Sequence, residues 1–256
     1  MGKTLLIADV NAVALADVAQ SLVATGYTVT AMPVDVSSRT SVQSLAHAAA
    51  ALGRVVQVAH TAGLSPNMAS PANILAVNLK GVAIVLEEFG HVIANGGSGV
   101  IIASMAGHML PPLPSSHCEA LACTPVSDLL QLAFLQPEFI PDSAMAYAMS
   151  KRANHLRVQA ASIDWGARCA RINSISPGII ATSMAQHEMD SPAGSVMRAL
   201  IAASSAKRMG TPGEIVSAAA FLLGPDSSFI SGSDLLVDGG VVAAIGAGRQ
   251  TTPDIQ

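Results

Sequence analysis

The chain has 256 residues, of which 51% are hydrophobic and 12% charged, and its formal net charge is −4. This charge and an aromatic content of 3% argue against a nucleic-acid-binding surface. Polar and turn-forming residues interrupt every window of about 18 residues, so we expect no membrane-spanning helix. Asp9 interrupts the first apolar run and the three cysteines are scattered, which argues against secretion and fits a reducing compartment. We therefore expect a cytoplasmic α/β protein.

Short apolar runs alternate with segments of helical periodicity along most of the chain. The first run, Thr4–Ala8, precedes a helical pattern from Asn11 to Thr25 that ends at Gly26. Parallel βαβ units produce this alternation, so we expect a single domain over residues 1–256, a three-layer Rossmann-like fold with a doubly wound parallel sheet. The later expected strands are Tyr27–Val34, Arg54–Ala59, Gly99–Ser104, Ala170–Ile175 and Asp234–Val237, and the later expected helices cover residues 38–53, 74–89, 147–166, 192–203 and 211–223.

The alternation stops at a long insertion, residues 108–143, ahead of the helix at 147–166. The insertion is rich in proline and carries Leu and Phe residues, with one short helix expected around Val126–Leu135. Long ordered loops in compact domains are usually functional, so we interpret the insertion as a lid or as a substrate-binding or oligomer-forming element. Residues 246–256 are expected to be a frayed tail.

Tyr147 and Lys151 stand four residues apart in an expected helix, Ala146–Asn154. That spacing places both side chains on one helix face. A nearby ammonium favours the phenolate, which lowers the pKa of the tyrosine and makes the pair suitable for acid/base chemistry. The spacing alone is not specific, because it also arises by chance.

A metal site is not expected from the local sequence. Five potential ligands cluster between residues 108 and 123, but their spacing matches no standard zinc pattern. They are His108, His117, Cys118, Glu119 and Cys123.

The order of several short motifs resembles the short-chain dehydrogenase/reductase family over nearly the whole chain. Tyr147 and Lys151 match its signature pair, and His60-Thr61-Ala62-Gly63 is similar to its Asn-Asn-Ala-Gly motif but lacks both asparagines. The other matching positions are Asp35-Val36, Asn78, Ser104, Pro177-Gly178 with Thr182, and Asp238-Gly239-Gly240.

The resemblance implies an oxidoreductase that interconverts a secondary alcohol and a ketone. Tyr147 would be the general acid/base, Ser104 would hold the substrate oxygen, Lys151 would support the tyrosine, and Asn78 would position a water. Asp9, at the end of a strand, would bind the adenosine ribose and favour NAD over NADP. The expected cofactor contacts are Asp9, Asp35, Val36, Thr61, Ala62, Gly63, Tyr147, Lys151, Pro177, Gly178, Ile180 and Thr182.

Several of these assignments have simple structural alternatives. Asp9 is also explained as a solvated strand end, Asn78 as a polar residue of a helix, Ser104 as a satisfied hydroxyl at a strand end, and Thr182 as a helix cap. The resemblance further implies a homodimer or homotetramer, and the apolar insertion suggests an apolar small-molecule alcohol or ketone as substrate.

The family's glycine-rich phosphate turn is absent after the first strand, where Asp9-Val10-Asn11 follows instead. The spacing from Asp9 to Asp35 fits the family's second and third strands, so we expect the chain to lack the first βα unit, roughly 20–25 residues. Its neighbouring strands would then close together or leave a gap. In the alternative register, Thr4–Ala8 is the first strand and a later unit is missing. A catalytically inactive relative with a structural or ligand-binding role is the alternative function.

Overall fold

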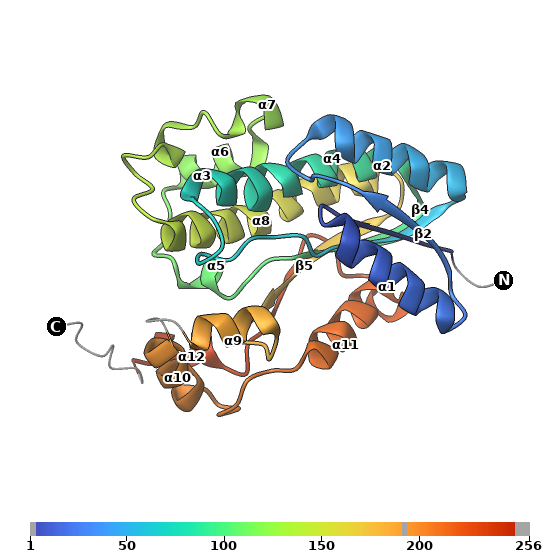
Figure 1. The fold of residues 1–256 in the computed structure, drawn as a ribbon. Coiled ribbons are helices and arrows are strands. Elements are labelled where there is room, and N and C mark those ends of the chain that lie inside the picture. Colours follow the sequence, from blue (N-terminus) through green and yellow to red (C-terminus); the bar gives the residue numbers. More distant parts are fainter. Residues whose placement is uncertain (1–3, 191–193, 249–256) are drawn as a thin grey trace.

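The computed structural model describes residues 4–190 and 194–248, which form parallel sheets covered by helices on both faces (Figure 1). Strands β1 (Thr4–Asp9) and β2 (Thr28–Pro33) pair with each other. A second sheet has the order β3-β4-β5-β6. Its strands are β3 (Val55–His60), β4 (Ile93–Ile102), β5 (Arg171–Pro177) and β6 (Asp234–Val237). The predicted α/β fold with parallel strands is confirmed.

In the described part of the chain, the two-stranded and the four-stranded sheet are not joined to each other through β1 and β3. No ladder joins these strands within residues 4–190 and 194–248. The break falls where the sequence interpretation puts the absent first strand, and that interpretation stays a prediction.

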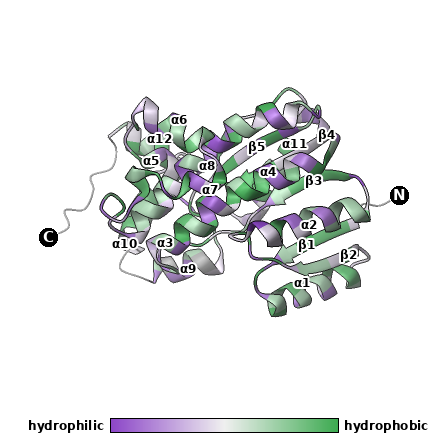
Figure 2. Ribbon diagram, turned by 90° about the horizontal axis from the view of Figure 1, so that it is seen from above, coloured by the Kyte–Doolittle hydropathy of each residue, from purple (hydrophilic) through white to green (hydrophobic). Residues whose placement is uncertain are grey.

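Helices form one layer on each side of the strands (Figure 1). One layer contains α2 (Arg39–Leu52), the π-helical segment η1 (Leu75–Gly81), α4 (Val82–Val92) and α8 (Ser143–Gly166). The opposite layer contains α1 (Ala12–Ala24) and α11 (Pro212–Leu223). Figure 2 shows hydrophobic residues along β1 and β3, between these layers.

Local sequence signals explain where the helices begin. The side chain of Asn11 accepts hydrogen bonds from Val13 N and Ala14 N at the start of α1. The hydroxyl of Ser38 caps α2, and Thr211 forms a capping box with Glu214 at the start of α11. Each cap satisfies backbone N–H groups that have no partner inside the helix.

Trp165 fixes the packing of α8 over the large sheet. Its side chain is fully buried and its indole N–H donates to the carbonyl of Leu86 at 3.0 Å. Gly99 in β4 leaves room for the ring, because a Cβ atom there would lie 2.7 Å from it. A buried tryptophan with a satisfied N–H contributes both apolar area and orientation.

The insertion is folded against α8. It contains the end of α5 (Ala106–Met109), then α6 (Ser115–Cys123), α7 (Val126–Leu129) and a 3-10 turn at Ala133–Leu135. Leu121 and Leu129 are fully buried, and the buried Arg157 of α8 donates to the carbonyl oxygens of Leu121 (3.0 Å) and Thr124 (2.8 Å). The single expected helix around Val126–Leu135 is therefore two short pieces, and α6 was not predicted.

The remaining short elements are α3 (Pro71–Ile74), α9 (Ser183–Met189), α10 (Gly194–Ala203), a 3-10 turn at Pro225–Ser227 and α12 (Val241–Gly246). The sequence analysis did not predict α12. Most of the expected frayed tail, residues 249–256, lies outside the described residues. Among the described helices, none combines the length and the apolar composition that a membrane crossing requires.

Candidate active site

Most predicted site residues follow the carboxyl ends of the strands. In parallel sheets these ends lie along one edge, where ligands of open α/β folds bind. The positions concerned are Asp9 at the end of β1, Asp35-Val36 after β2, Thr61–Gly63 after β3, Ser104 after β4, and Pro177-Gly178 at the end of β5.

Tyr147 and Lys151 lie one turn apart on α8, as predicted. The ammonium nitrogen of Lys151 is 5.5 Å from the centroid of the Tyr147 ring. Lys151 is only 5% exposed and donates to the carbonyl oxygen of Ile102, the last residue of β4, at 3.0 Å. Burial lowers its pKa to about 8. The pair thus combines a partly buried phenol with a desolvated ammonium.

Ser104 is held close to α8 by the tight turn that follows β4. Its hydroxyl oxygen accepts a hydrogen bond from Ala106 N at 3.2 Å. Gly107 allows the turn to touch the helix, because a Cβ atom there would lie 2.8 Å from Arg152 N. The serine end of β4 and the Lys151 turn of α8 are therefore neighbours.

Asn78 is fully buried within η1 and clamps the loop after β3. Its carboxamide oxygen accepts from Leu64 N and its NH₂ group donates to Leu64 O, both at 2.8 Å. A Cβ atom on Gly63 would lie 3.3 Å from the Asn78 oxygen and 3.6 Å from the Lys151 ammonium, so a small residue suits this position. π-helical segments occur often at functional sites. The predicted water-positioning role of Asn78 stays a prediction; the structure shows a positioning role toward the loop.

His60 is a site residue that the sequence analysis did not select. It is buried at the end of β3, and its Nε2 has no hydrogen-bond partner in the described part of the chain. Burial, together with the charge of Lys151, lowers the pKa of His60 to about 4. The signal was present in the sequence, since His60 stands where the similar motif has asparagine.

The two acidic residues at the adenosine side have different surroundings. Asp9 is exposed, and one of its carboxylate oxygens accepts from Asn11 N at 2.8 Å. One carboxylate oxygen of Asp35 accepts from both the N–H (2.9 Å) and the hydroxyl (2.7 Å) of Ser37, which forms a local turn. Thr61 and Ala62, which follow the end of β3, are also exposed.

The segment after β5 lies against the end of β6. Pro177 O accepts from Met105 N at 2.9 Å, and a Cβ atom on Gly178 would lie 2.6 Å from the Cα of Asp238. Ile180 bridges to Gly210 and, with Asp238, lines a hollow of about 80 Å³. Thr182 caps α9 by accepting from Ala185 N at 3.2 Å. Thr182 therefore acts as the helix cap that was given as its structural alternative, and its cofactor role stays a prediction.

Comparisons with known proteins identify the family. A family model described as enoyl-(acyl carrier protein) reductase matches residues 1–122 and 113–242. Short-chain dehydrogenase/reductase bsc3 of Alternaria brassicicola is 43% identical over 243 residues, which cover 94% of this chain and 88% of that protein. The chain belongs to the short-chain dehydrogenase/reductase family.

Two further proteins match over similar lengths. Galactitol 2-dehydrogenase (L-tagatose-forming) of Cereibacter sphaeroides is 28% identical, with 93% of this chain and 85% of that protein covered. The crystal structure of 3-alpha-hydroxysteroid dehydrogenase from Pseudomonas sp. B-0831, complexed with NADH, superposes with a TM-score of 0.75 and 26% identity. The superposition covers 97% of this chain and 100% of the hydroxysteroid dehydrogenase chain. The predicted family membership and Rossmann-like fold are confirmed.

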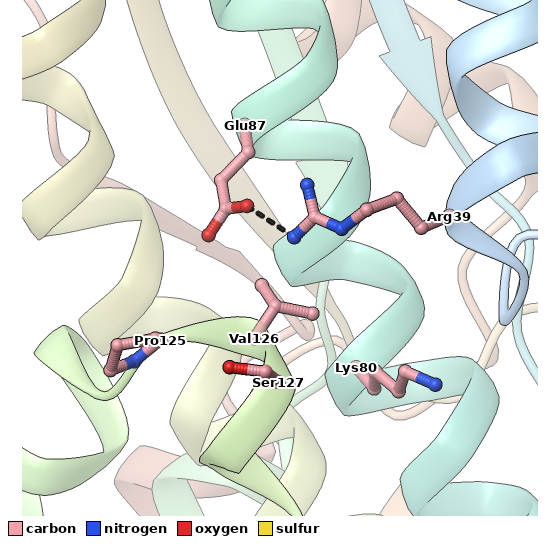
Figure 3. Close-up of a pocket in the computed structure, with 6 residues that line it drawn as sticks. All are labelled: Arg39, Lys80, Glu87, Pro125, Val126 and Ser127. Atoms are coloured by element: carbon pink, nitrogen blue, oxygen red, sulfur yellow. Dashed lines mark hydrogen bonds and ion pairs between the residues drawn. The ribbon is translucent and has the colours of Figure 1, made fainter.

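A second hollow of this short-chain dehydrogenase/reductase lies in the helix layer rather than at the strand ends. It has a volume of about 500 Å³ and is lined by α2, η1, α4 and the insertion (Figure 3). The guanidinium of Arg39 forms ion pairs with Glu87, which also lines the hollow, and with Glu88. Because the Arg39 guanidinium is already paired with these two carboxylates, it is not free to bind an anionic ligand in the hollow.

Proposed function

We propose that the chain is an NAD(H)-dependent oxidoreductase that interconverts a secondary alcohol and a ketone. The observation that carries the proposal is the Tyr147–Lys151 pair on α8, packed beside the serine end of β4. Relatives named as a galactitol 2-dehydrogenase and a hydroxysteroid dehydrogenase complexed with NADH support both the reaction class and the cofactor class.

In this proposal Tyr147 exchanges a proton with the substrate oxygen and Ser104 donates a hydrogen bond to the same atom. With a pKa of about 8, Lys151 is mostly charged at pH 7. Its charge favours the phenolate of Tyr147 and so makes proton transfer at neutral pH easier. The nicotinamide cofactor supplies or accepts the hydride.

The strand-end residues fit the two ends of a dinucleotide. Gly63 and Gly178 keep backbone free of side chains where a Cβ atom would crowd Asn78 or Asp238. We propose that the exposed Asp9 binds the adenosine ribose hydroxyls, and that Pro177, Gly178, Ile180 and Thr182 hold the nicotinamide end. A carboxylate at Asp9 repels a ribose phosphate, so this assignment favours NAD over NADP.

The assignment of Asp9 is tested by nicotinamide fluorescence titrations with NADH and NADPH. We expect NADH to bind at least about tenfold more tightly, a difference of about 1.4 kcal/mol. Asp9→Ser should narrow this preference, because serine can still accept from Asn11 N but carries no charge.

Each other outcome has a definite meaning. Binding of neither nucleotide contradicts the oxidoreductase proposal and favours the alternative of an inactive relative. Tighter binding of NADPH, or an unchanged preference in Asp9→Ser, contradicts only the role of Asp9. Oxidation should then be screened on a series of secondary alcohols from polyol to apolar cyclic compounds, since the apolar insertion leads us to propose an apolar substrate.

A further inference from the structure

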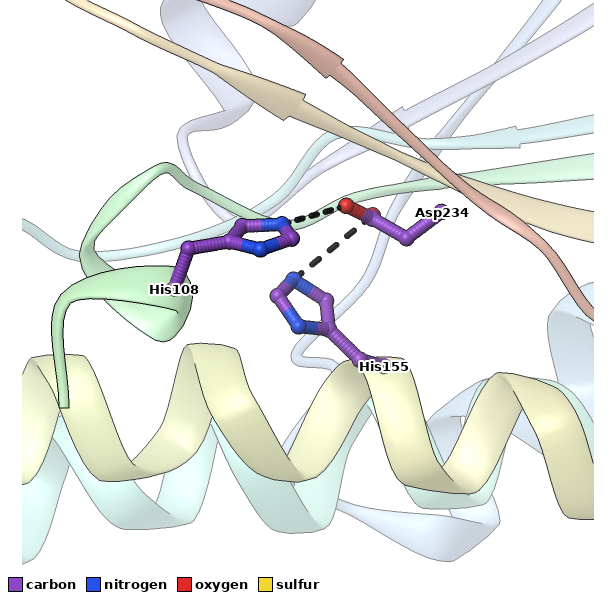
Figure 4. A group of neighbouring side chains, drawn as sticks. All are labelled: His108, His155 and Asp234. Carbon is purple, nitrogen blue, oxygen red and sulfur yellow. Dashed lines mark hydrogen bonds and ion pairs between the residues drawn. The ribbon is translucent and has the colours of Figure 1, made fainter. Parts of the chain in front are cut away.

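Two imidazoles and a carboxylate meet between α8 and the strands of the large sheet (Figure 4). They belong to His108 of α5, His155 of α8 and Asp234 of β6. Their ligand atoms all lie within 4.8 Å of one another. His108 Nε2 is 2.7 Å from one oxygen of Asp234, and His155 Nε2 is 3.6 Å from the other.

Hydroxyl groups hold the carboxylate in place. Ser174 and Ser176, both on β5, donate to the same oxygen of Asp234 at 2.5 and 3.0 Å. His155 Nε2 lies 2.8 Å from the Ser176 hydroxyl, and the buried Nδ1 of His155 has no hydrogen-bond partner among the described residues. The two serine hydrogen bonds to Asp234 are of the kind that orients a carboxylate ligand of a metal site.

The cluster is reachable from outside. The side chain of His108 is 27% exposed and that of Asp234 is 11% exposed, while that of His155 is only 3% exposed. An ion can therefore approach from the side of His108 and meet a preformed, largely desolvated set of donors.

We propose that His108, His155 and Asp234 bind one divalent transition-metal ion of the zinc class. Two imidazole nitrogens and one carboxylate oxygen suit Zn²⁺, Co²⁺ or Fe²⁺, and three protein ligands leave a position for water. Ligand atoms around one such ion lie roughly 3.3 Å apart. His155 Nε2 is now 3.6 Å from the Asp234 carboxylate, so binding requires a modest rotation of the side chains. The ion would take the place of the hydrogen bond between His155 and Ser176.

The position of the site indicates what the ion would do. His108 is four residues beyond Ser104, and His155 is one turn beyond Lys151. A shared ion would tie α5, α8 and β6 together and so fix the spacing between the serine and the lysine. The expectation of no metal considered only ligands close together in sequence, whereas His108 and Asp234 are 126 positions apart.

The proposal is tested with Co²⁺ as the probe on the protein without a histidine tag. We expect visible cobalt absorption to saturate at one equivalent and to be displaced by Zn²⁺. His108→Gln should weaken Co²⁺ affinity at least about tenfold, with a similar effect for Asp234→Asn. The matched control is His47→Gln, which removes an exposed histidine from α2 and should leave Co²⁺ affinity unchanged.

Circular dichroism and thermal melts establish that each variant is folded. If Asp234→Asn fails to fold, the partly exposed His108 decides the question alone. No saturable cobalt spectrum in the wild type, or equal Co²⁺ affinity in wild type and His108→Gln, overturns the proposal. Because the readout is metal binding rather than turnover, its failure is separate from a failure of the oxidoreductase proposal.

Discussion

The buried ammonium of Lys151 carries an electrostatic cost in the site. Its folded-state pKa of about 8 is below the ordinary value of 10.5. The unfolded chain therefore binds more protons than the folded chain between these two values, so the stability of the folded state rises as pH rises from 8 to 10.5. The shift corresponds to about 3 kcal/mol.

Lys151→Met should remove this pH dependence. We expect the free energy of unfolding of wild type, relative to the variant, to increase by about 3 kcal/mol between pH 8 and pH 10.5. Urea unfolding of both proteins at several pH values measures the difference, in which titrations shared by both proteins cancel. A constant difference across this range would show that Lys151 is not desolvated as the structure places it.

His60 predicts a dependence at the acid side. Its pKa falls from 6.5 to about 4 on burial. The free energy of unfolding is therefore unaffected by protonation of His60 above pH 6.5 and decreases as pH falls from 6.5 to 4, because the unfolded chain binds the proton first. In His60→Asn, the free energy of unfolding lost between pH 6.5 and pH 4 should be smaller than in wild type by about 3 kcal/mol. Urea unfolding at pH 7, 5.5 and 4 tests it, and identical acid losses in both proteins would contradict the burial of a neutral imidazole.

At the scale of elements, the insertion behaves as part of the core. Leu121 of α6 is fully buried and Arg157 of α8 bonds to the α6–α7 turn. Leu121→Ala should therefore lower the free energy of unfolding by about 2–5 kcal/mol, through lost burial and a cavity.

Chemical unfolding measures this cost, with Phe139→Ala as the matched control. Phe139 belongs to the same insertion but is 64% exposed, so its truncation should cost less than about 1 kcal/mol. Equal, small costs for both variants would mean that the insertion is a loosely attached lid.

Most elements could be predicted because their causes are local. Alternating apolar runs and caps such as Ser38 place strands and helices to within a few residues. β4 was expected at Gly99 but begins at Ile93, because Asn95-Gly96-Gly97 reads as a turn while the structure takes it into an irregular stretch of the strand, where the pairing register shifts. The helix α6 was missed because prolines flank it and its stability comes from contacts with α8.

The site divides in the same way. Tyr147 and Lys151 could be found because one helical turn relates them. The cluster of His108, His155 and Asp234 could not, because only the packing of three distant elements brings it together. The neighbourhood of His60 and Lys151 has the same cause.

At the scale of the whole molecule, the proposed cofactor contacts lie on both sheets. Asp9 belongs to β1, while Lys151 and Gly178 contact the four-stranded sheet. Since β1 and β3 share no ladder among the described strands, a dinucleotide that contacts both sheets should link them.

NADH should therefore slow amide hydrogen exchange in β1. At a free concentration of 100 times its Kd, we expect about 2.7 kcal/mol of added global stability and stronger protection of residues 4–9. Hydrogen exchange followed by mass spectrometry, with and without NADH, measures it. Protection confined to the large sheet would contradict a binding mode that includes Asp9.

The chemical role of Tyr147 is the central claim, and Tyr147→Phe tests it most directly. With a secondary alcohol that the wild type oxidises, the variant should lose at least about 100-fold in kcat, because the proton acceptor is gone. Its Kd for NADH should stay within about twofold, and Tyr27→Phe, which alters the chain's other tyrosine, should leave kcat unchanged. A Tyr147→Phe enzyme that turns over at the wild-type rate would contradict the account.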